Sequence, residues 1–205
     1  MKRIGVFIAF LFVLFSGFLY ADSPITSTDF YTAYKDIEMV NKAAKLDVIT
    51  PEIAEFLSSP KNPVDVKAAV INALSWDING KNNAVLYLAY LEKKYNNDID
   101  TLTLEPLTAD EVFCLGYLLA MDDYFFVGEA LDLLLIAWEL NDTSFTVSII
   151  LALVEAQEAM DYDWCEVWML TEDVLLDESL KKDMRDEAIT IIVDYMSLYK
   201  DECEE

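Results

Sequence analysis

Apolar residues recur every three to four positions along most of the chain, which is the period of an amphipathic α-helix. Helices are expected over residues 64–76, 84–95, 111–121, 127–140, 145–160, 164–176 and 180–200, after a mixed segment over 30–46 and a helix that starts at Pro51. Only 5 Gly and 5 Pro occur, which is sparse for an all-β protein built on tight turns. The pattern predicts an all-α fold, in which the helices over 131–138 and 147–154 are interior because they are apolar on nearly every side.

The helices fall into pairs joined by short turns. Pairs start near Val64, Thr108, Thr143 and Ser179, at intervals of 44, 35 and 36 residues, and Glu111 gives the second pair a capping box. Such intervals are typical of helical-repeat arrays. Because a single hairpin cannot bury both of its faces, neighbouring pairs must cover one another. We therefore expect stacked antiparallel helical hairpins, forming a short α-solenoid.

One stretch resembles the first helix of a HEAT-type repeat. It covers residues 64–75, with Val66-Lys67 where that pattern has Val-Arg and Ala73-Leu74-Ser75 where it has Ala-Leu-Gly. This resemblance covers a single repeat. It implies a helical-repeat protein and carries no catalytic residues.

A second stretch, over residues 114–142, resembles a tetratricopeptide repeat. Leu115-Gly116 matches the first helix of that repeat, and Ala130 and Ala137 match the two small residues of its second helix, where neighbouring helices approach closely. The turn is about two residues longer than in that family, and Asn141-Asp142 stands where the consensus has Asp-Pro. This resemblance also covers one repeat and implies no catalytic residues.

Residues 1–21 have the layout of a secretory signal peptide: a basic start with Lys2 and Arg3, an apolar run, and Ala21 before a polar stretch. An uncleaved anchor is the alternative, because about 17 apolar residues are the lower limit for a membrane span. Cleavage predicts export to the bacterial periplasm or the exterior, a helical domain over 22–205 and no stable membrane span. The loop over 96–107 is the expected internal boundary of that domain.

The charge is strongly negative and uneven. The chain has 14 Lys+Arg and 38 Asp+Glu, and loss of residues 1–21 would leave 12 − 38 = −26. Residues 101–205 carry 4 basic and 26 acidic side chains, and no Lys or Arg occurs between Lys94 and Lys181. Nucleic acid and anionic membranes are poor partners for such a polyanion. A basic protein or peptide fits better, and the alternative is a solvated acidic face that serves solubility.

The chain has 3 Cys, which limits it to one intramolecular disulfide. Cys114 and Cys165 lie in apolar helical segments and are expected to be buried thiols, whereas Cys203 in the acidic tail is expected to be exposed. An oxidising compartment would permit pairing, and the odd count leaves one thiol over. The sequence leaves open which residues pair.

The stretch from 75 to 91 could be a calcium loop or a turn between helices. Calcium loops of the paired-helix type need Gly at the sixth position and a bidentate Glu at the twelfth. Counted from Asp77, Gly80 comes two positions early, Leu88 stands twelfth, and Lys81 would repel a cation. A turn is predicted, with Gly80 left-handed at the helix end and Asn82 or Asn83 capping the next helix.

The sequence contains no His, which removes Ser–His–Asp and Cys–His catalysis and nearly all catalytic zinc sites. No Gly-rich phosphate loop is present, and no cofactor is expected. The densest set of carboxylates is interleaved with aromatic residues and comprises Glu155, Glu158, Asp161, Asp163 and Glu166, with Tyr162, Trp164 and Trp168 between them. The two Trp residues are expected to pack in the core.

This set of acids supports three hypotheses. In the preferred one, the protein is a non-catalytic interaction module that faces its partner with Glu155, Glu158, Asp161, Tyr162 and Asp163. In the second, it is a carbohydrate-active enzyme with Glu178 or Glu166 as the catalytic acid. Glu178-Ser179 is similar to the Glu-Ser pair of exported lytic transglycosylases, although their Gly-Leu-Met-Gln-type segment is absent. In the third, Asp161, Asp163 and Glu166 bind a divalent cation weakly.

Overall fold

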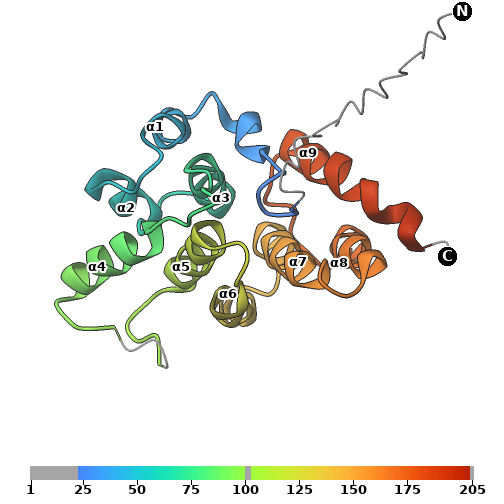
Figure 1. Ribbon diagram of the computed structural model, residues 1–205. Helices are drawn as coiled ribbons and strands as arrows, with labels where there is room; N and C mark the ends of the chain where they lie inside the picture. The colour runs from blue at the N-terminus through green and yellow to red at the C-terminus, as the bar shows by residue number, and fades with distance from the viewer. Residues whose placement is uncertain (1–22, 100–102, 204–205) are drawn as a thin grey trace, which may run out of the picture.

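The computed structural model describes residues 23–99 and 103–203, which are all-α with no named strand (Figure 1). Nine α-helices and two 3-10 helices occur within those ranges: η1 Phe30–Tyr34, α1 Glu38–Leu46, α2 Pro51–Leu57, α3 Val64–Ala73, α4 Asn83–Tyr95, α5 Ala109–Asp122, α6 Gly128–Leu140, α7 Phe145–Ala159, α8 Trp164–Leu176, α9 Asp186–Met196 and η2 Ser197–Cys203. The expected signal segment over 1–21 lies outside the described residues. Within them, no helix combines the length and the apolar character needed to cross a membrane.

The starts of α2 and α5 follow from local capping, as the sequence predicts. Thr50 accepts a hydrogen bond from the Ile53 amide and precedes Pro51 at the first position of α2. Thr108 and Glu111 form the expected capping box at the start of α5. These signals act over three or four residues, so tertiary context does not disturb them.

Two of the predicted helices are interrupted. The segment over 30–46 divides into η1 and α1 around Asp36. The helix expected over 180–200 begins only at Asp186, because the chain over 180–185 runs alongside the start of α7. There the Lys181 amide donates to the Thr143 carbonyl (2.7 Å), and Asp183 accepts from the Thr146 amide (2.9 Å), which caps α7.

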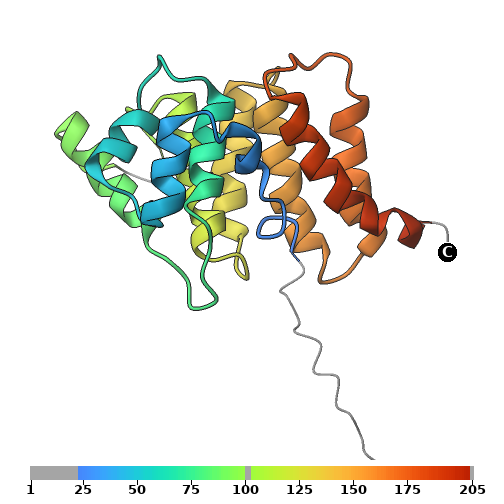
Figure 2. The ribbon, with the colours of Figure 1, turned by 90° about the horizontal axis from the view of Figure 1, so that it is seen from above.

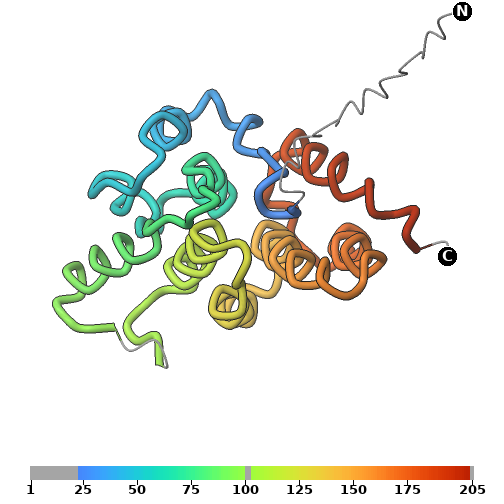
Figure 3. Tube along the Cα trace, viewed as in Figure 1, coloured from blue at the N-terminus to red at the C-terminus, as the bar shows by residue number. Residues whose placement is uncertain are grey.

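The hairpins α5–α6 and α7–α8 are packed pairs that follow one another along the chain (Figure 3). Gly116 allows the first pair to approach closely, because a Cβ atom there would lie 3.0 Å from the Leu134 side chain and 3.2 Å from the Ala130 carbonyl oxygen. The expected pairing of 64–76 with 84–95 is wrong, since α3 packs chiefly against α1, η1 and α5, while α4 packs against α5. Helix α3 is central and buried on every side over residues 66–73.

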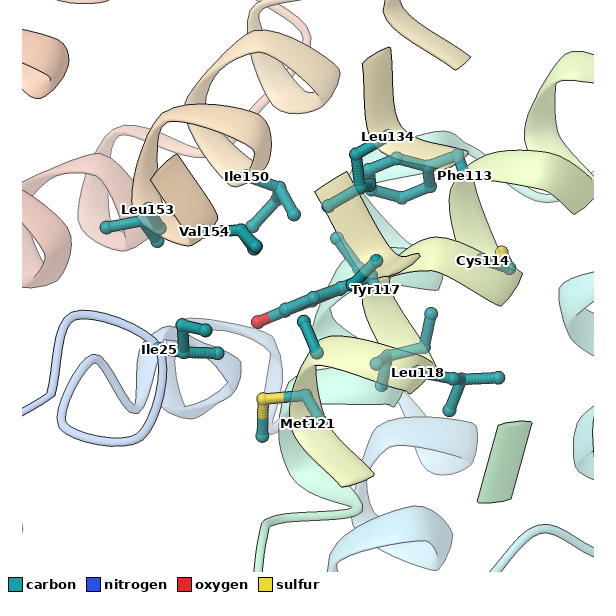
Figure 4. Close-up of a cluster of buried hydrophobic side chains, with 14 of the residues drawn as sticks. Ile25, Phe113, Cys114, Tyr117, Leu118, Met121, Leu134, Ile150, Leu153 and Val154 are labelled. Atoms are coloured by element: carbon teal, nitrogen blue, oxygen red, sulfur yellow. The ribbon is translucent and has the colours of Figure 1, made fainter. Parts of the chain in front are cut away.

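The chain's own N-terminal segment, Ser23–Tyr34, lies between α3 and α9 (Figure 2). Ile25 is buried and faces Tyr117 of α5 and Val154 of α7 (Figure 4). Asn72 of α3 holds the segment through the Thr28 carbonyl (3.1 Å) and the Tyr31 amide (3.0 Å). Residues 23–34 are therefore packed into the protein, with η1 in contact with both α3 and α9.

A polar contact joins η1 and the residues after it to Arg185, which directly precedes α9. The Arg185 guanidinium lies over the Tyr34 ring, 4.4 Å from its centroid, and binds both carboxylate oxygens of Asp36 at 2.5 and 3.0 Å. The Tyr34 hydroxyl donates to Asp65 (2.9 Å) and accepts from the Arg185 amide (3.2 Å). This contact holds α9 against η1 and closes one side of the array.

Two lysines form ion pairs with acids in the first turn of α5. The fully buried Lys67 Nζ lies 2.5 Å from Asp110, and Lys94 Nζ lies 2.7 Å from Glu111. Glu111 also accepts hydrogen bonds from the Tyr95 hydroxyl (2.7 Å) and the Thr108 amide (2.9 Å). Burial acts to raise the pKa of Glu111, but these donors outweigh burial and hold the pKa below its ordinary value.

Of the two helices predicted to be interior, only α7 is buried over the expected residues 147–154. Helix α6 lies at the edge of the array, where Leu135, Trp138 and Leu140 are exposed (Figure 1). The prediction for α6 is wrong because an apolar run does not reveal whether a neighbour covers both faces of its helix. The uncovered face of α6 is a feature that only the structure shows.

The prediction that Cys165 is a buried thiol is also wrong. It forms a disulfide with Cys203, with a Cα–Cα distance of 4.6 Å, and this bond joins η2 to α8. Cys114 is a free, buried thiol, as expected, and burial raises its pKa. The ring of Trp168 is buried, as predicted, while Trp164 is 46% exposed and contacts Tyr199 of η2.

Candidate functional site

The stretch between α3 and α4 is a turn, as predicted. Asp77 accepts hydrogen bonds from the amide and the side chain of Asn79, at 2.8 and 3.0 Å, and Gly80 has φ +79°. Lys81 forms an ion pair with Asp47, so a cation already lies in the turn. The left-handed residue that follows the end of α3 is Ser75 (φ 60°) and not Gly80, because α3 ends earlier than expected.

This turn is held against the end of α5. The Lys81 amide donates to the Asp122 carbonyl (2.9 Å), and the Asp122 carboxylate accepts from the Ala84 amide (2.7 Å). Asp122 thus caps α4 from a neighbouring helix, and the prediction that Asn82 or Asn83 caps it is wrong. Asn83 instead accepts from the Ile49 amide (2.8 Å). Burial raises the pKa of Asp122 above its ordinary value. The amide donors act to lower the pKa, but burial is the larger effect.

A groove of about 930 Å³ opens beside this contact, between the start of α4, the α5–α6 turn and the end of α7. We call it the acidic groove. Its volume is within the range of ligand-binding clefts. The residues that line it are Lys81, Ala84, Val85, Leu119, Asp122, Asp123, Tyr124, Phe125, Phe126, Val127, Gly128, Glu129, Ala130, Gln157, Glu158 and Asp161.

Large apolar side chains stand exposed at the acidic groove. Phe126 is 81% exposed, Phe125 58% and Val85 63%. Ile78, 59% exposed, lines a smaller adjoining pocket together with both Phe residues. Phe125 packs on Tyr124, with ring centroids 4.2 Å apart, and Tyr124 packs in turn on Trp76. Adjoining exposed apolar residues of this kind mark sites of contact with other molecules.

Carboxylates surround these aromatic rings. Asp123, Glu129, Glu158 and Asp161 line the acidic groove and are exposed. Among the residues that the structure describes, none of the four forms an ion pair with Lys or Arg. The one cation in the lining, Lys81, is engaged with Asp47. The groove therefore combines an apolar surface with carboxylates whose negative charge no Lys or Arg of the described residues neutralises by an ion pair.

The structure separates the predicted interaction residues. Glu158 and Asp161 line the acidic groove. Glu155 lines a second groove, along α7, and its pKa is raised by burial and by the nearby Glu166 and Glu158. Tyr162 is exposed in the turn after α7, outside both linings, and Asp163 accepts the Cys165 and Glu166 amides at 3.0 and 3.2 Å as the cap of α8.

The two candidate catalytic acids are not brought together. Glu178 is exposed in the turn after α8, and Glu166 lies in the first turn of α8. Neither lines the acidic groove or the groove along α7. Nor are Asp161, Asp163 and Glu166 assembled as ligands, because no three Asp, Glu or Cys side chains within 23–99 and 103–203 are placed to hold a metal ion.

Comparison with known protein families, with curated proteins and with solved structures found no match to this chain. The site is therefore interpreted from its own geometry. Sequence reasoning missed Phe125 and Phe126, although the signal was present: two large apolar residues stand in a predicted turn between Asp122-Asp123 and the next helix, where a polar turn is the norm. A turn has no buried face, so such residues have no local reason to be apolar.

Proposed function

We propose that this protein is an exported, non-catalytic interaction module that binds a basic protein or peptide segment in the acidic groove. The observation that carries the proposal is the exposed pair Phe125 and Phe126 beside unpaired carboxylates. Aromatic residues in a partly enclosed groove supply most of the energy of many interfaces. Carboxylates around them favour basic partners and speed their encounter.

Two further observations support the proposal. The disulfide between Cys165 and Cys203 is of a kind that persists in oxidising compartments, which agrees with the signal-like residues 1–21. The packed hairpins α5–α6 and α7–α8 support an assignment to the helical-repeat class, in which stacked hairpins present binding surfaces. Residues 23–34 already cover parts of α3 and α9, whereas the acidic groove is open to a partner.

The proposal is tested by capture of partners from an envelope extract. Immobilised wild-type protein is compared with Phe126→Ser, with Glu158→Gln and with Leu198→Ser. Leu198 is 68% exposed on η2, away from the groove, and serves as a matched apolar control. Bound proteins are eluted with salt and identified by mass spectrometry.

We expect wild type to capture a basic protein that elutes with salt. The Leu198→Ser variant should capture it in the same amount, and both groove variants should capture little or none of it. Recovery of the same proteins by wild type and both groove variants would contradict the acidic groove as the binding site. An empty eluate at low salt would contradict the interaction function itself.

A further inference from the structure

The groove along α7 has the shape of a site for a helix. Its floor is one stripe of α7, formed by Ser148, Leu151, Ala152 and Glu155, at the spacing i, i+3, i+4 and i+7. The stripe runs about 10 Å along the helix, or two turns. Ser148 and Ala152 are small, which leaves space for close approach by another helix.

The walls of this groove come from the two helices beside α7 (Figure 1). Leu135 and Trp138, three residues apart on α6, form one wall, while Leu170 and Val174, four apart on α8, belong to the other. Leu135 is 42% exposed and Trp138 39%. The two walls and the floor are thus three helix faces that present apolar side chains to one groove of about 280 Å³.

The charged residues of this groove favour a basic partner. Glu155 in the floor and Asp173 in the α8 wall are the charged residues of the lining, and both are acidic. Within the described residues neither forms an ion pair. Helices α6, α7 and α8 contain no Lys or Arg, so no basic residue on them can neutralise these acids. A second copy of this chain would bring more negative charge, whereas a basic segment brings its complement.

We propose that the groove along α7 is a second interaction surface, which accepts an amphipathic helix with apolar residues on one face and Lys or Arg on its flanks. An apolar face laid between helical walls is a common mode of helix recognition. Trp138 is its central anchor, because large aromatic residues in apolar grooves dominate such contacts. This surface lies along α7 between α6 and α8, and its lining shares no residue with the acidic groove.

The test uses an 18-residue synthetic peptide of Leu and Lys, arranged to be amphipathic as a helix, with a fluorescent label. A peptide of the same composition in shuffled order is the control. Binding is measured by anisotropy in the Phe126→Ser background, so that the acidic groove does not contribute its aromatic anchor. Trp138→Ala, Leu135→Ser and Asp173→Lys are compared with Met169→Ala, an exposed residue of α8 outside the groove. Circular dichroism confirms that each variant is folded.

The patterned peptide is expected to bind more tightly than the shuffled one, and each groove variant to weaken its binding by about tenfold or more. Met169→Ala is expected to leave the affinity unchanged. Equal binding of both peptides, or unchanged affinity in Trp138→Ala and Leu135→Ser, would overturn the proposal. So would light scattering that shows a dimer which Trp138→Ala dissociates, because the occupant would then be a second copy. Each of these failures leaves the test of the acidic groove intact.

Discussion

The helices up to α5 and the helices from α6 to α8 use their carboxylates in opposite ways. In the first group, lysines of α3 and α4 make acids of α5 structural: the buried Lys67 pairs with Asp110, and the buried Glu111 pairs with Lys94. On α6, α7 and α8, the acids Glu129, Glu158 and Asp173 have no ion-pair partner among the described residues and lie beside grooves with apolar side chains. The comparison shows that acids which meet a lysine are used to hold the fold, whereas these three acids of α6 to α8 stay free for a partner.

The largest effect is expected at Glu111. Glu111→Ala removes a buried acceptor of three hydrogen bonds, from Lys94, Tyr95 and Thr108, and their combined loss is expected to lower the free energy of unfolding by about 3–5 kcal/mol. Urea denaturation measures this change. The matched control is Glu129→Gln, an exposed acid of α6, which is expected to stay within about 0.5 kcal/mol of wild type. Similar losses for both would remove the distinction between the two sets of acids.

The next largest effect on stability is expected for the disulfide between Cys165 and Cys203, which joins η2 to α8. Cys203→Ser opens the loop closed over a separation of 38 residues and is expected to cost about 2–4 kcal/mol of unfolding free energy. Addition of a reductant to wild type should give the same loss in urea denaturation. The variant itself should not respond to the reductant. A wild type that is insensitive to reductant would contradict the role of this bond.

A smaller effect on stability, with a large one on binding, is expected for Phe126→Ser. The side chain is 81% exposed, so the free energy of unfolding should change by less than about 0.5 kcal/mol. In the Trp138→Ala background, in which the groove along α7 lacks its anchor, the affinity for a basic Leu/Lys peptide should fall by about tenfold, as for an interface anchor. Calorimetric titration and thermal unfolding measure the two quantities. A loss of stability without a loss of affinity would show that Phe126 stabilises the fold and does not contribute to binding.

The smallest expected effect is the pH dependence of stability. The ionised carboxylates of Glu111 and Glu155 contribute to the free energy of unfolding with opposite signs. The pKa of Glu111 is lowered in the folded state, so its stabilisation is present above the ordinary value of 4.5 and lost as pH falls through the folded pKa. The pKa of Glu155 is raised by burial, so its ionised form destabilises the fold at neutral pH. Glu155→Gln is expected to stabilise by less than about 1 kcal/mol near pH 7, and this gain should fade as pH falls toward 4.5. Melting temperatures of both proteins from pH 7 to pH 4 measure the effect. A gain that grows with falling pH would contradict the argument.

Much of the fold could be predicted from the sequence because its signals are local. Helical periodicity and the caps at Thr50 and Thr108 act within a few residues. The helix predicted over 180–185 failed because that segment has a helical pattern but pairs with Thr143 and Phe145 instead. The exposed face of α6 could not be predicted either, since periodicity does not show which faces a neighbour covers.

The candidate site was predictable only in part. Glu158 and Asp161 were singled out by charge density, and they do line the acidic groove. The pairing of Cys165 with Cys203 brings together residues 38 positions apart, and no short-range pattern encodes it. Phe125 and Phe126 carried a local signal, namely two large apolar residues in a turn. The sequence does not show that these two residues lie beside α4 and the end of α7. That position depends on tertiary packing, and it is what forms the groove.

The most direct test of the central claim compares two triple variants. Asp123→Asn, Glu129→Gln and Glu158→Gln neutralise exposed acids of the acidic groove, while Glu38→Gln, Glu55→Gln and Asp98→Asn neutralise exposed acids of the earlier helices and of the loop after α4. Both remove the same charge. The affinity for the basic Leu/Lys peptide is measured over a series of salt concentrations, with Trp138→Ala in both proteins so that the groove along α7 does not contribute its anchor. We predict a fall of about tenfold or more and a weaker salt dependence for the first triple only. Equal losses in both would show that net charge, and not the acidic groove, attracts the partner.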